Sequence, residues 1–555
     1  MRTAVTLYAL ALLVRLALIA LYPNPAYPDA YYYVDVARAL HAGQGFNVDF
    51  IWAFVEVGGR LPVDPHLPIP SNAHWMPLAS LVQVPFMAVF GPVAWAGMLP
   101  FAIVGALAAP LTWLIAREAG ARPAVQLGAG ILAAVPAASM VFMAQPDNFS
   151  LYQPLGAAAL WLGARGLKGD ARAFALAGLL VGVASLARND GVLIGLALGL
   201  LFVWDRWRAW RSAGARRPAI PLWAGVACAG LFLVAIAPWW LRQLAVFGDI
   251  SPSSASGRIL WIRQIADMNS VTAPATFSSF VGQGLGPLLE SRVWGLVAAF
   301  GNFAVIPCSV ILFPFVLVGA WLRRRSLDFR PFLLYAAILF GAGGLLFAVH
   351  VPYGMFLHSA VALVPHSYVL ALEGVVAVVG WIAARRRTWS EPQAQRIFLT
   401  AAVVLGVITA AGGTWKVQTE WSQEKDLRQD VAVELPRLGA TPTDRLMTAD
   451  AAGFKYFTGH PGVVTPSDPL PVIETAARDY DVRWLVLERA HIVPGLDGVL
   501  KGTARPAWVG PDVYSIHLPD SPNDGYPDIA VFPVCWSSAD TRCAASARGG
   551  ATAAP

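Results

Sequence analysis

Runs of about 20 apolar residues recur along most of this chain, and short arginine-rich segments separate many of them. A helix rises about 1.5 Å per residue, so a run of this size crosses the roughly 30 Å hydrocarbon core of a bilayer. About eleven candidate spans result, with approximate centres at residues 13, 105, 134, 157, 180, 198, 230, 308, 340, 370 and 405. The pattern predicts an α-helical polytopic membrane protein.

The composition excludes two other classes of protein. Hydrophobic residues make up 57% of the chain and charged residues 13%, which is too apolar for a disordered chain or a large soluble enzyme. The formal net charge of +6 is compatible with nucleic-acid binding, but the basic residues gather in short clusters between the apolar runs. That pattern orients membrane helices, so we expect no nucleic-acid partner.

Clusters of arginine and lysine fall in every second loop. They occupy segments 117–122, 165–172, 206–217, 323–325 and 385–387. Because such clusters are retained in the cytoplasm, these loops are predicted to be cytoplasmic. The first apolar run is interpreted as a retained helix, since Arg15 interrupts it and no convincing cleavage site follows. With a cytoplasmic N-terminus and an odd number of spans, the tail after about residue 414 is predicted to lie outside the membrane.

Two domains are predicted. Residues 1–414 form the membrane domain, with long outer loops at 23–77 and 241–293, and the apolar stretch after Pro77 lies along the membrane surface. Residues 415–555 alternate helical and strand-like patterns, which is typical of a small extracytoplasmic α/β domain. The end from about residue 537 is rich in Ser, Ala and Gly and is expected to be flexible.

The four cysteines show no Cys-x-x-Cys spacing, so the sequence contains no cysteine-based zinc or redox motif. Cys228 and Cys308 lie inside apolar segments. Cys535 and Cys543 are the two that could form a disulfide, and the sequence does not decide whether they do.

Acidic residues in the outer loops are the first functional candidates, because a charge at the membrane face is costly unless it is paired or solvated. Asp29 follows the first span in a tyrosine-rich segment, and Asp147 lies in the turn Gln145-Pro146-Asp147-Asn148. For both residues, capping of the following helix is about as probable as function on local grounds.

Several basic residues are predicted on the same outer face. Arg242 ends an outer helix, where it can snorkel to the headgroups or bind a phosphate with two hydrogen bonds. Arg258 and Arg263 extend this basic surface, and His74 and His358 are further phosphate or metal contacts. Packing explains a lone histidine more often than function does.

The order of these segments resembles the GT-C glycosyltransferases of the family 39 type, which include protein O-mannosyltransferases and bacterial lipid A aminoarabinose transferases. The resemblance covers most of residues 1–415. It is carried by the aspartate after the first span, Pro77-Leu78 before a horizontal helix, the Pro-Asp turn, Arg-Asn-Asp-Gly at 188–191, and Pro-Trp-Trp-Leu-Arg at 238–242 with Phe-Gly and Ser-Pro behind it.

The resemblance implies an integral membrane enzyme that transfers a sugar from a polyprenyl-phosphate donor to a glycan, lipid or protein acceptor on the outer face of the cytoplasmic membrane. It makes Asp29 the general base of an inverting transfer and Asp147 the second acid. The donor phosphate would be bound by Arg242, with Arg258, Arg263 and His358 as weaker candidates. The resemblance establishes no cofactor, and it leaves open whether the enzyme uses a divalent metal ion.

The chain departs from the family pattern at two places. Ala30 follows Asp29, where the family often has a second acid. His74-Trp75-Met76-Pro77-Leu78 stands where the lipid A transferases have Glu-Lys-Pro-Pro-Leu, so His74 could replace the acid as a metal or phosphate contact.

Three alternative functions stay open on the sequence. A transporter or flippase of lipid-linked sugars is the main one, although the sequence shows no convincing internal repeat and its polar residues cluster at one face. A non-catalytic scaffold or sensor would tolerate Asp29→Asn. An O-antigen ligase or polymerase would use similar chemistry.

Overall fold

The structure is a computed structural model of the chain, and it describes residues 1–212, 217–346, 354–386, 388–519, 521–522, 524–537, 540 and 542. Arg216, Arg387, Cys543 and the rest of the predicted flexible end lie outside these residues. The described chain forms two compact units. Unit 1 comprises Met1–Pro25, Trp75–Ser254 and Val281–Thr419, and unit 2 comprises Ala26–His74, Ala255–Phe280 and Glu420–Pro555.

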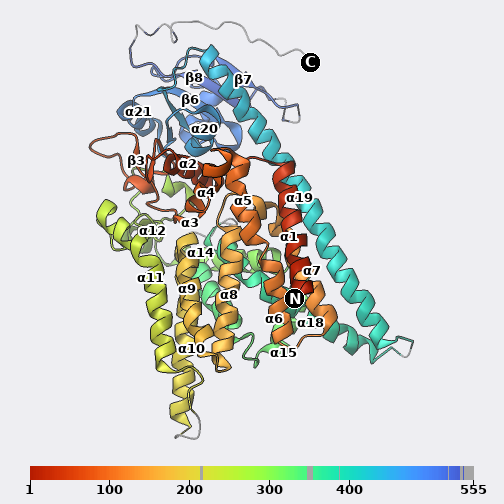
Figure 1. The fold of residues 1–555 in the computed structure, drawn as a ribbon. Helices are drawn as coiled ribbons and strands as arrows, with labels where there is room; N and C mark the ends of the chain where they lie inside the picture. The colour runs from red at the N-terminus through yellow and green to blue at the C-terminus, as the bar shows by residue number, and fades with distance from the viewer. Residues whose placement is uncertain are drawn as a thin grey trace. The chain divides into compact units, whose positions relative to one another are not determined.

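Unit 1 is built of helices (Figure 1). They are α1 (Arg2–Leu21), α3 (Leu78–Leu81), α4 (Val84–Phe90), α5 (Ala94–Gly105), α6 (Ala108–Glu118), α7 (Pro123–Ala134), α8 (Phe149–Leu167), α9 (Ala171–Ala187), α10 (Val192–Arg211), α11 (Leu222–Phe247), α14 (Leu285–Val305), α15 (Phe313–Arg323), α16 (Arg330–Gly341), α17 (Met355–Ala360), α18 (Val364–Ala383) and the first part of α19 (Glu391–Arg437).

Five helical stretches of the described chain are long and apolar enough to cross a membrane. They are Arg2–Leu21, Ala94–Glu118, Leu222–Phe247, Met355–Ala383 and Glu391–Arg437. Shorter apolar helices such as α7, α9 and α15 accompany them. The predicted polytopic helical fold is confirmed. The number of eleven spans and the orientation of the termini stay predictions.

The structure differs from the sequence prediction around residue 308, where one continuous span was expected. Helix α14 ends at Val305 and α15 begins at Phe313. Pro307 and Pro314 each lack the amide hydrogen that a helix interior requires. Between them Ser309 and Val310 adopt φ angles of 52° and 57°, which a right-handed helix does not contain. The apolar run is therefore divided into two helices.

A buried arginine explains how α1 packs in unit 1. Arg15 is 0% exposed, and its Nη1 atom donates to the carbonyl oxygens of Ala11 at 3.1 Å and Ala134 at 3.2 Å. Ala134 is the last residue of α7, and the final carbonyls of a helix have no partner within it. Arg15 therefore caps the negative end of α7, so the interruption of the first apolar run has a structural cause.

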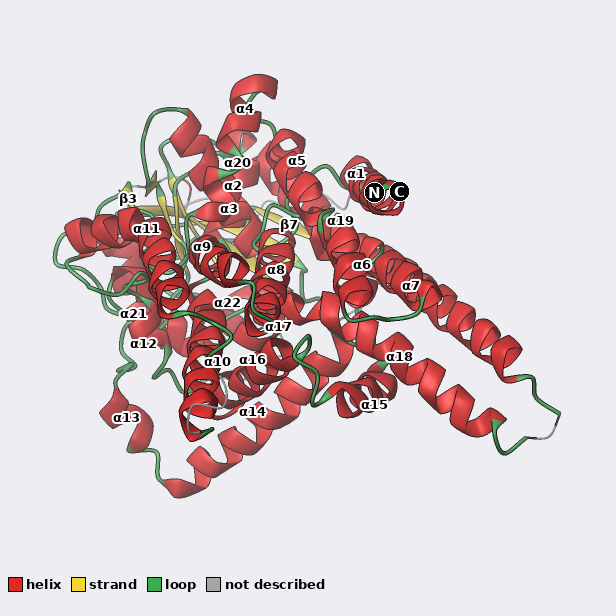
Figure 2. Cartoon of the chain, turned by 60° about the horizontal axis from the view of Figure 1, so that its bottom comes forward, coloured by secondary structure: helices red, strands yellow, loops and turns green. Residues whose placement is uncertain are grey.

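Unit 2 combines helices with the strands of the chain (Figure 2). Its main elements are α2 (Pro28–His41), β1 (Asn47–Val48), β2 (Phe50–Ile51), η1 (Phe54–Val57), β3 (Ile69–Pro70), α12 (Ser256–Ile259), α13 (Phe277–Val281), the end of α19, β4 (Arg445–Thr448), α20 (Ala451–Thr458), β5 (Gly462–Val464), α21 (Leu470–Asp479), β6 (Val482–Glu488), α22 (Asp497–Leu500), β7 (Tyr514–Ile516) and β8 (Ile529–Pro533).

Six of these strands form one sheet in the order β2-β5-β4-β6-β8-β7. Within this sheet, β2, β5, β4 and β6 run parallel to one another. Strand β8 is antiparallel to both of its neighbours, β6 and β7. Trp484 of β6 and Phe454 of α20 pack with Val431 and Leu435 of α19 in a buried cluster. The predicted α/β character of the tail is confirmed.

The composition of unit 2 was only partly expected. The segments 26–74 and 255–280, predicted as outer loops, group with the tail, and β2 adds a strand to the tail's sheet. The predicted boundary at residue 414 falls inside α19, which continues unbroken to Arg437 (Figure 1). Cys228 and Cys308 are free, and Cys535 is disulfide-bonded.

Candidate functional site

Asp147 lies in a buried turn of unit 1, between the 3₁₀ helix η2 (Ala137–Ala144) and α8. The residue is 0% exposed, and its Oδ1 atom accepts a hydrogen bond from the backbone of Asn148 at 2.5 Å. Asn148, and not Asp147, occupies the N-cap of α8.

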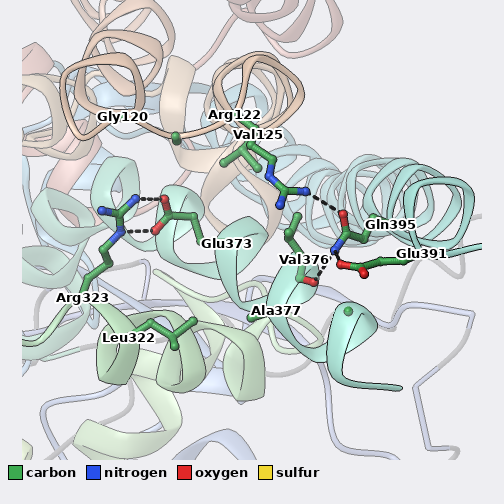
Figure 3. Close-up of a pocket in the computed structure, with 12 residues that line it drawn as sticks. Gly120, Arg122, Val125, Leu322, Arg323, Glu373, Val376, Ala377, Glu391 and Gln395 are labelled. Carbon is green, nitrogen blue, oxygen red and sulfur yellow. Dashed lines mark hydrogen bonds and ion pairs between the residues drawn. The ribbon is translucent and has the colours of Figure 1, made fainter. Parts of the chain in front are cut away.

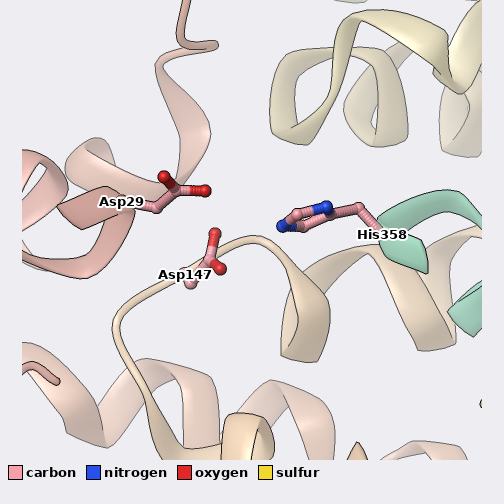
Figure 4. Close-up of side chains that lie close together, drawn as sticks. All are labelled: Asp29, Asp147 and His358. Atoms are coloured by element: carbon pink, nitrogen blue, oxygen red, sulfur yellow. The ribbon is translucent and has the colours of Figure 1, made fainter. Parts of the chain in front are cut away.

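His358 faces the same turn. Its side chain and that of Asp147 point toward one another, and their ligating atoms lie within 4.8 Å (Figure 4). The imidazole stacks on Phe149 with the ring centroids 4.5 Å apart, and its Nδ1 atom lies 3.3 Å from the carbonyl oxygen of Gly354. Unit 1 thus holds an acid and an imidazole in a defined arrangement.

A hydrogen-bond network fixes the helix that carries this histidine. The Ser359 hydroxyl donates to the Asp190 carboxylate, and the Tyr335 hydroxyl donates to the Ser359 carbonyl oxygen at 3.3 Å. The hydroxyls of Tyr335 and Tyr152 lie 3.0 Å apart. Arg188 makes two 3.0 Å hydrogen bonds to Asp190.

Asp29 belongs to unit 2 and is the third side chain drawn in Figure 4. It lies in the first turn of α2, whose N-cap is Tyr27 and whose first residue is Pro28. Proline suits that first position because its fixed φ matches the helix. Asp29 is therefore not the N-cap residue. Tyr32 lies three residues later, on the same face of the helix.

The sequence reasoning missed Glu56, which meets that face of α2. The Tyr32 hydroxyl donates to Glu56 Oε1 at 3.2 Å and accepts from the Asn72 backbone at 2.7 Å. Burial raises the pKa of Glu56 to about 8, although hydrogen bonds from Tyr32 and the His74 backbone oppose the shift. At pH 7 this carboxyl group is mostly protonated. No short motif marks such a residue, because its burial depends on distant segments.

Two predicted phosphate contacts are neighbours in unit 2. The His74 imidazole stacks on Trp52, with centroids 5.9 Å apart and planes 4° from parallel, and its Nδ1 atom lies 3.4 Å from Ser256 Oγ. Arg258 follows on the same short helix, α12. Its guanidinium lies beside Gly58, where an added Cβ would be 3.8 Å from Nη2. The structure therefore brings His74, Arg258 and the Glu56 loop together.

The other two predicted arginines have local partners. Arg242 of α11 lies over the rings of Trp239 and Phe247, 5.0 and 5.1 Å from their centroids. Arg263 donates from Nε to Asp267 Oδ2 at 3.3 Å, and its backbone N–H donates to the same oxygen at 2.9 Å. Phosphate binding by either arginine stays a prediction.

A separate cavity of about 500 Å³ lies in unit 1 among α7, α15, α18 and α19 (Figure 3). Arg323 makes an ion pair with Glu373, and Arg122 donates to Gln395 at 2.6 Å. Gln395 in turn donates to Glu391 at 2.9 Å. These side chains bond to one another across the cavity, which is the arrangement of a structural network.

Comparison with known proteins supports the family resemblance. Residues 72–241 match the profile of the dolichyl-phosphate-mannose-protein mannosyltransferase family. No curated protein matches the sequence. The matched segment is less than half of the chain, so this match shows similarity to the family over that region alone.

Two crystal structures share the fold over nearly the whole chain. ArnT from Cupriavidus metallidurans bound to undecaprenyl phosphate is 15% identical with a TM-score of 0.56, and the apo form of the same protein is 16% identical with a TM-score of 0.55. Each match covers 95% of this chain and 97% of the other. The predicted resemblance to family 39 GT-C proteins, including aminoarabinose transferases, is confirmed.

Proposed function

We propose that this chain is a membrane glycosyltransferase that moves a sugar, with inversion, from a polyprenyl-phosphate donor to an acceptor hydroxyl at the outer face of the cytoplasmic membrane. The observation that carries the proposal is the pairing of the buried Asp147 with the partly exposed His358, in a fold shared with a protein crystallised with undecaprenyl phosphate.

Asp29 is the proposed general base. Its carboxylate takes the proton of the acceptor hydroxyl while the acceptor oxygen bonds to the anomeric carbon and the bond from that carbon to the phosphate oxygen breaks.

The leaving polyprenyl phosphate needs positive charge. Arg258 and His74 are proposed contacts because His74 lies against Ser256, which is two residues before Arg258 on α12. Arg242 and His358 are the proposed contacts from unit 1, and Arg263 is the weakest because Asp267 already pairs with it. A divalent ion could bind Asp147 and His358, both of which are metal-ligand types, and would supply Lewis acidity to the phosphate.

The test uses the protein in lipid nanodiscs, supplied with a panel of polyprenyl-phosphate sugars and with envelope acceptors. It measures the release of free polyprenyl phosphate. Asp29→Asn and Asp147→Asn are compared with Asp64→Asn, whose side chain is 94% exposed. We expect a loss of about a hundredfold or more for Asp29→Asn, the scale of a lost general base, and wild-type rates for Asp64→Asn.

Three outcomes would change this assignment. Equal turnover by wild type and Asp29→Asn would remove Asp29 from the mechanism. Movement of the lipid-linked sugar between leaflets without turnover would support a flippase. Full activity in the presence of a strong chelator would exclude a required metal ion.

A further inference from the structure

We propose that a cavity inside unit 2, at the carboxyl ends of β4, β5 and β6, binds the acceptor glycan and selects glycans that carry no phosphate or carboxylate at that position. The proposal rests on the proposed function and adds the chemical class of the acceptor to it.

The strand order of the sheet points to this cavity. The chain runs from β4 to its neighbour β5 and then crosses to β6 on the opposite side of β4, with all three strands parallel. The direction of winding therefore reverses at β4. Open α/β sheets bind ligands in the crevice outside the carboxyl ends of the strands at such a reversal.

A cavity of about 540 Å³ lies at that point, within the range of sites for small ligands. Asp450 follows β4, Thr465 follows β5 and His491 follows β6, and all three line it. Tyr27 and Pro28 line it as well. The cavity therefore reaches the first turn of α2, where the proposed base Asp29 is the next residue.

Its walls supply the groups that bind sugars. Thr465 is 3% exposed, and among the described residues neither its Oγ1 atom nor the buried Oδ1 atom of Asn269 has a hydrogen-bond partner. Buried polar atoms in folded proteins are normally satisfied, and glycan hydroxyls can donate to both. The rings of Trp421 and Tyr27, with centroids 5.6 Å apart, add apolar surface for the carbon faces of a sugar.

The charges of the cavity determine which glycan fits. Glu420, Glu424 and Asp450 line it, against Arg428 and the exposed His491. The guanidinium of Arg428 is shared between Asp450, at 2.6 Å, and Glu488, at 3.1 Å. The cavity is therefore acidic on balance. A phosphate or carboxylate placed there would meet like charge, which opposes binding and confers specificity.

The experiment measures binding without donor, so that it does not depend on turnover. Full-length protein in neutral-lipid nanodiscs is titrated with a neutral oligosaccharide from envelope glycan and, separately, with the same oligosaccharide carrying one phosphate. Saturation-transfer NMR measures the binding of each. We expect the phosphorylated form to bind at least about tenfold more weakly, with a smaller difference at 1 M salt because salt screens the repulsion. Glu424→Gln should reduce the difference.

Asp426→Asn is the matched control, since it removes the same charge two residues away on α19 from a side chain that is 66% exposed and does not line the cavity. It should keep the wild-type preference. Equal or tighter binding of the phosphorylated glycan would overturn the proposal. Absence of binding by either glycan, in protein that releases polyprenyl phosphate, would overturn the cavity assignment and leave the enzyme assignment intact. Glycan binding without any donor turnover would support the cavity and contradict the glycosyltransferase.

Discussion

Replacing Arg428 with methionine should destabilise unit 2 strongly. Arg428 is 2% exposed, and its guanidinium makes hydrogen bonds to Asp450 at 2.6 Å and to Glu488 at 3.1 and 3.4 Å. The side chains of both acids are themselves at most 8% exposed. Methionine fills a similar volume but leaves two buried carboxylates without their counter-ion.

The magnitude follows from the burial. Breaking a buried ion pair by removing one partner costs about 3–5 kcal/mol, because the remaining charge is desolvated and unpaired. A domain is stable by about 5–15 kcal/mol, so the change removes a large share of the total. Asp450 also caps α20 by accepting from the Gly453 backbone at 2.9 Å. Because this cap remains in the variant, it still holds the start of α20, and the expected loss of unfolding free energy stays at about 3–5 kcal/mol.

Pulse proteolysis in urea, applied to the protein in nanodiscs, measures the free energy of unfolding of the extramembrane part. Arg437→Met on the same helix is the control, since its side chain is 69% exposed and its pairing with Glu434 should contribute little. The triple variant Arg428→Met, Asp450→Asn, Glu488→Gln should recover much of the loss. A loss below about 1 kcal/mol for Arg428→Met alone would refute the argument that burial makes this network costly to break.

Three further predictions concern other parts of the chain. Arg15→Met should lower the midpoint of thermal unfolding in detergent more than Arg15→Lys, because lysine keeps a cationic donor for the Ala134 carbonyl and methionine has no donor. Burial raises the pKa of Asp35 to about 7, so folding takes up a proton between about pH 4 and 7. The free energy of unfolding therefore falls as the pH rises through that window. Asp35→Asn should reduce this dependence of the free energy of unfolding on pH, measured by urea titrations at pH 5 and 8. Ser359→Ala should lower kcat by about tenfold with little change in donor KM, because it frees the helix of His358 from Asp190, and an unchanged kcat would refute a positioning role.

Local patterns were sufficient for much of the fold. The apolar runs predicted the helical fold of unit 1, and the alternation in the tail predicted its α/β character. A helix following Asp29 was expected, and α2 begins one residue before it, at Pro28. Each of these features depends on neighbours within about one helical turn or one strand, which is the range that hydropathy and capping preferences report.

Features that depend on distant segments were not predicted. Phe50 and Ile51 form a strand only because β5, about 400 residues later, offers them a parallel edge. Burial raises the pKa of Glu56, and the Tyr32 hydroxyl beside its carboxyl group comes from α2 and also binds the Asn72 backbone. Two residues in a strand and one glutamate in the short 3₁₀ helix η1 carry no periodicity, so the sequence alone contains no signal for either.

The same long-range pairing indicates that the tail is incomplete without the first outer loop. Tyr31 of α2 packs on Tyr456 and Phe457 of α20 with centroids 5.4 and 5.5 Å apart, and Lys455 donates to Asp49 at 2.6 Å. Residues 415–555 expressed alone would expose those rings and the edge of β5, and exposed edges of this kind promote aggregation. We expect that fragment to bind a hydrophobic dye and aggregate, and a fusion that supplies residues 26–74 through a flexible linker to be monomeric. A monomeric, cooperatively folded tail without residues 26–74 would show that these contacts are dispensable, and the acceptor cavity would then have to form without Tyr27 and Pro28.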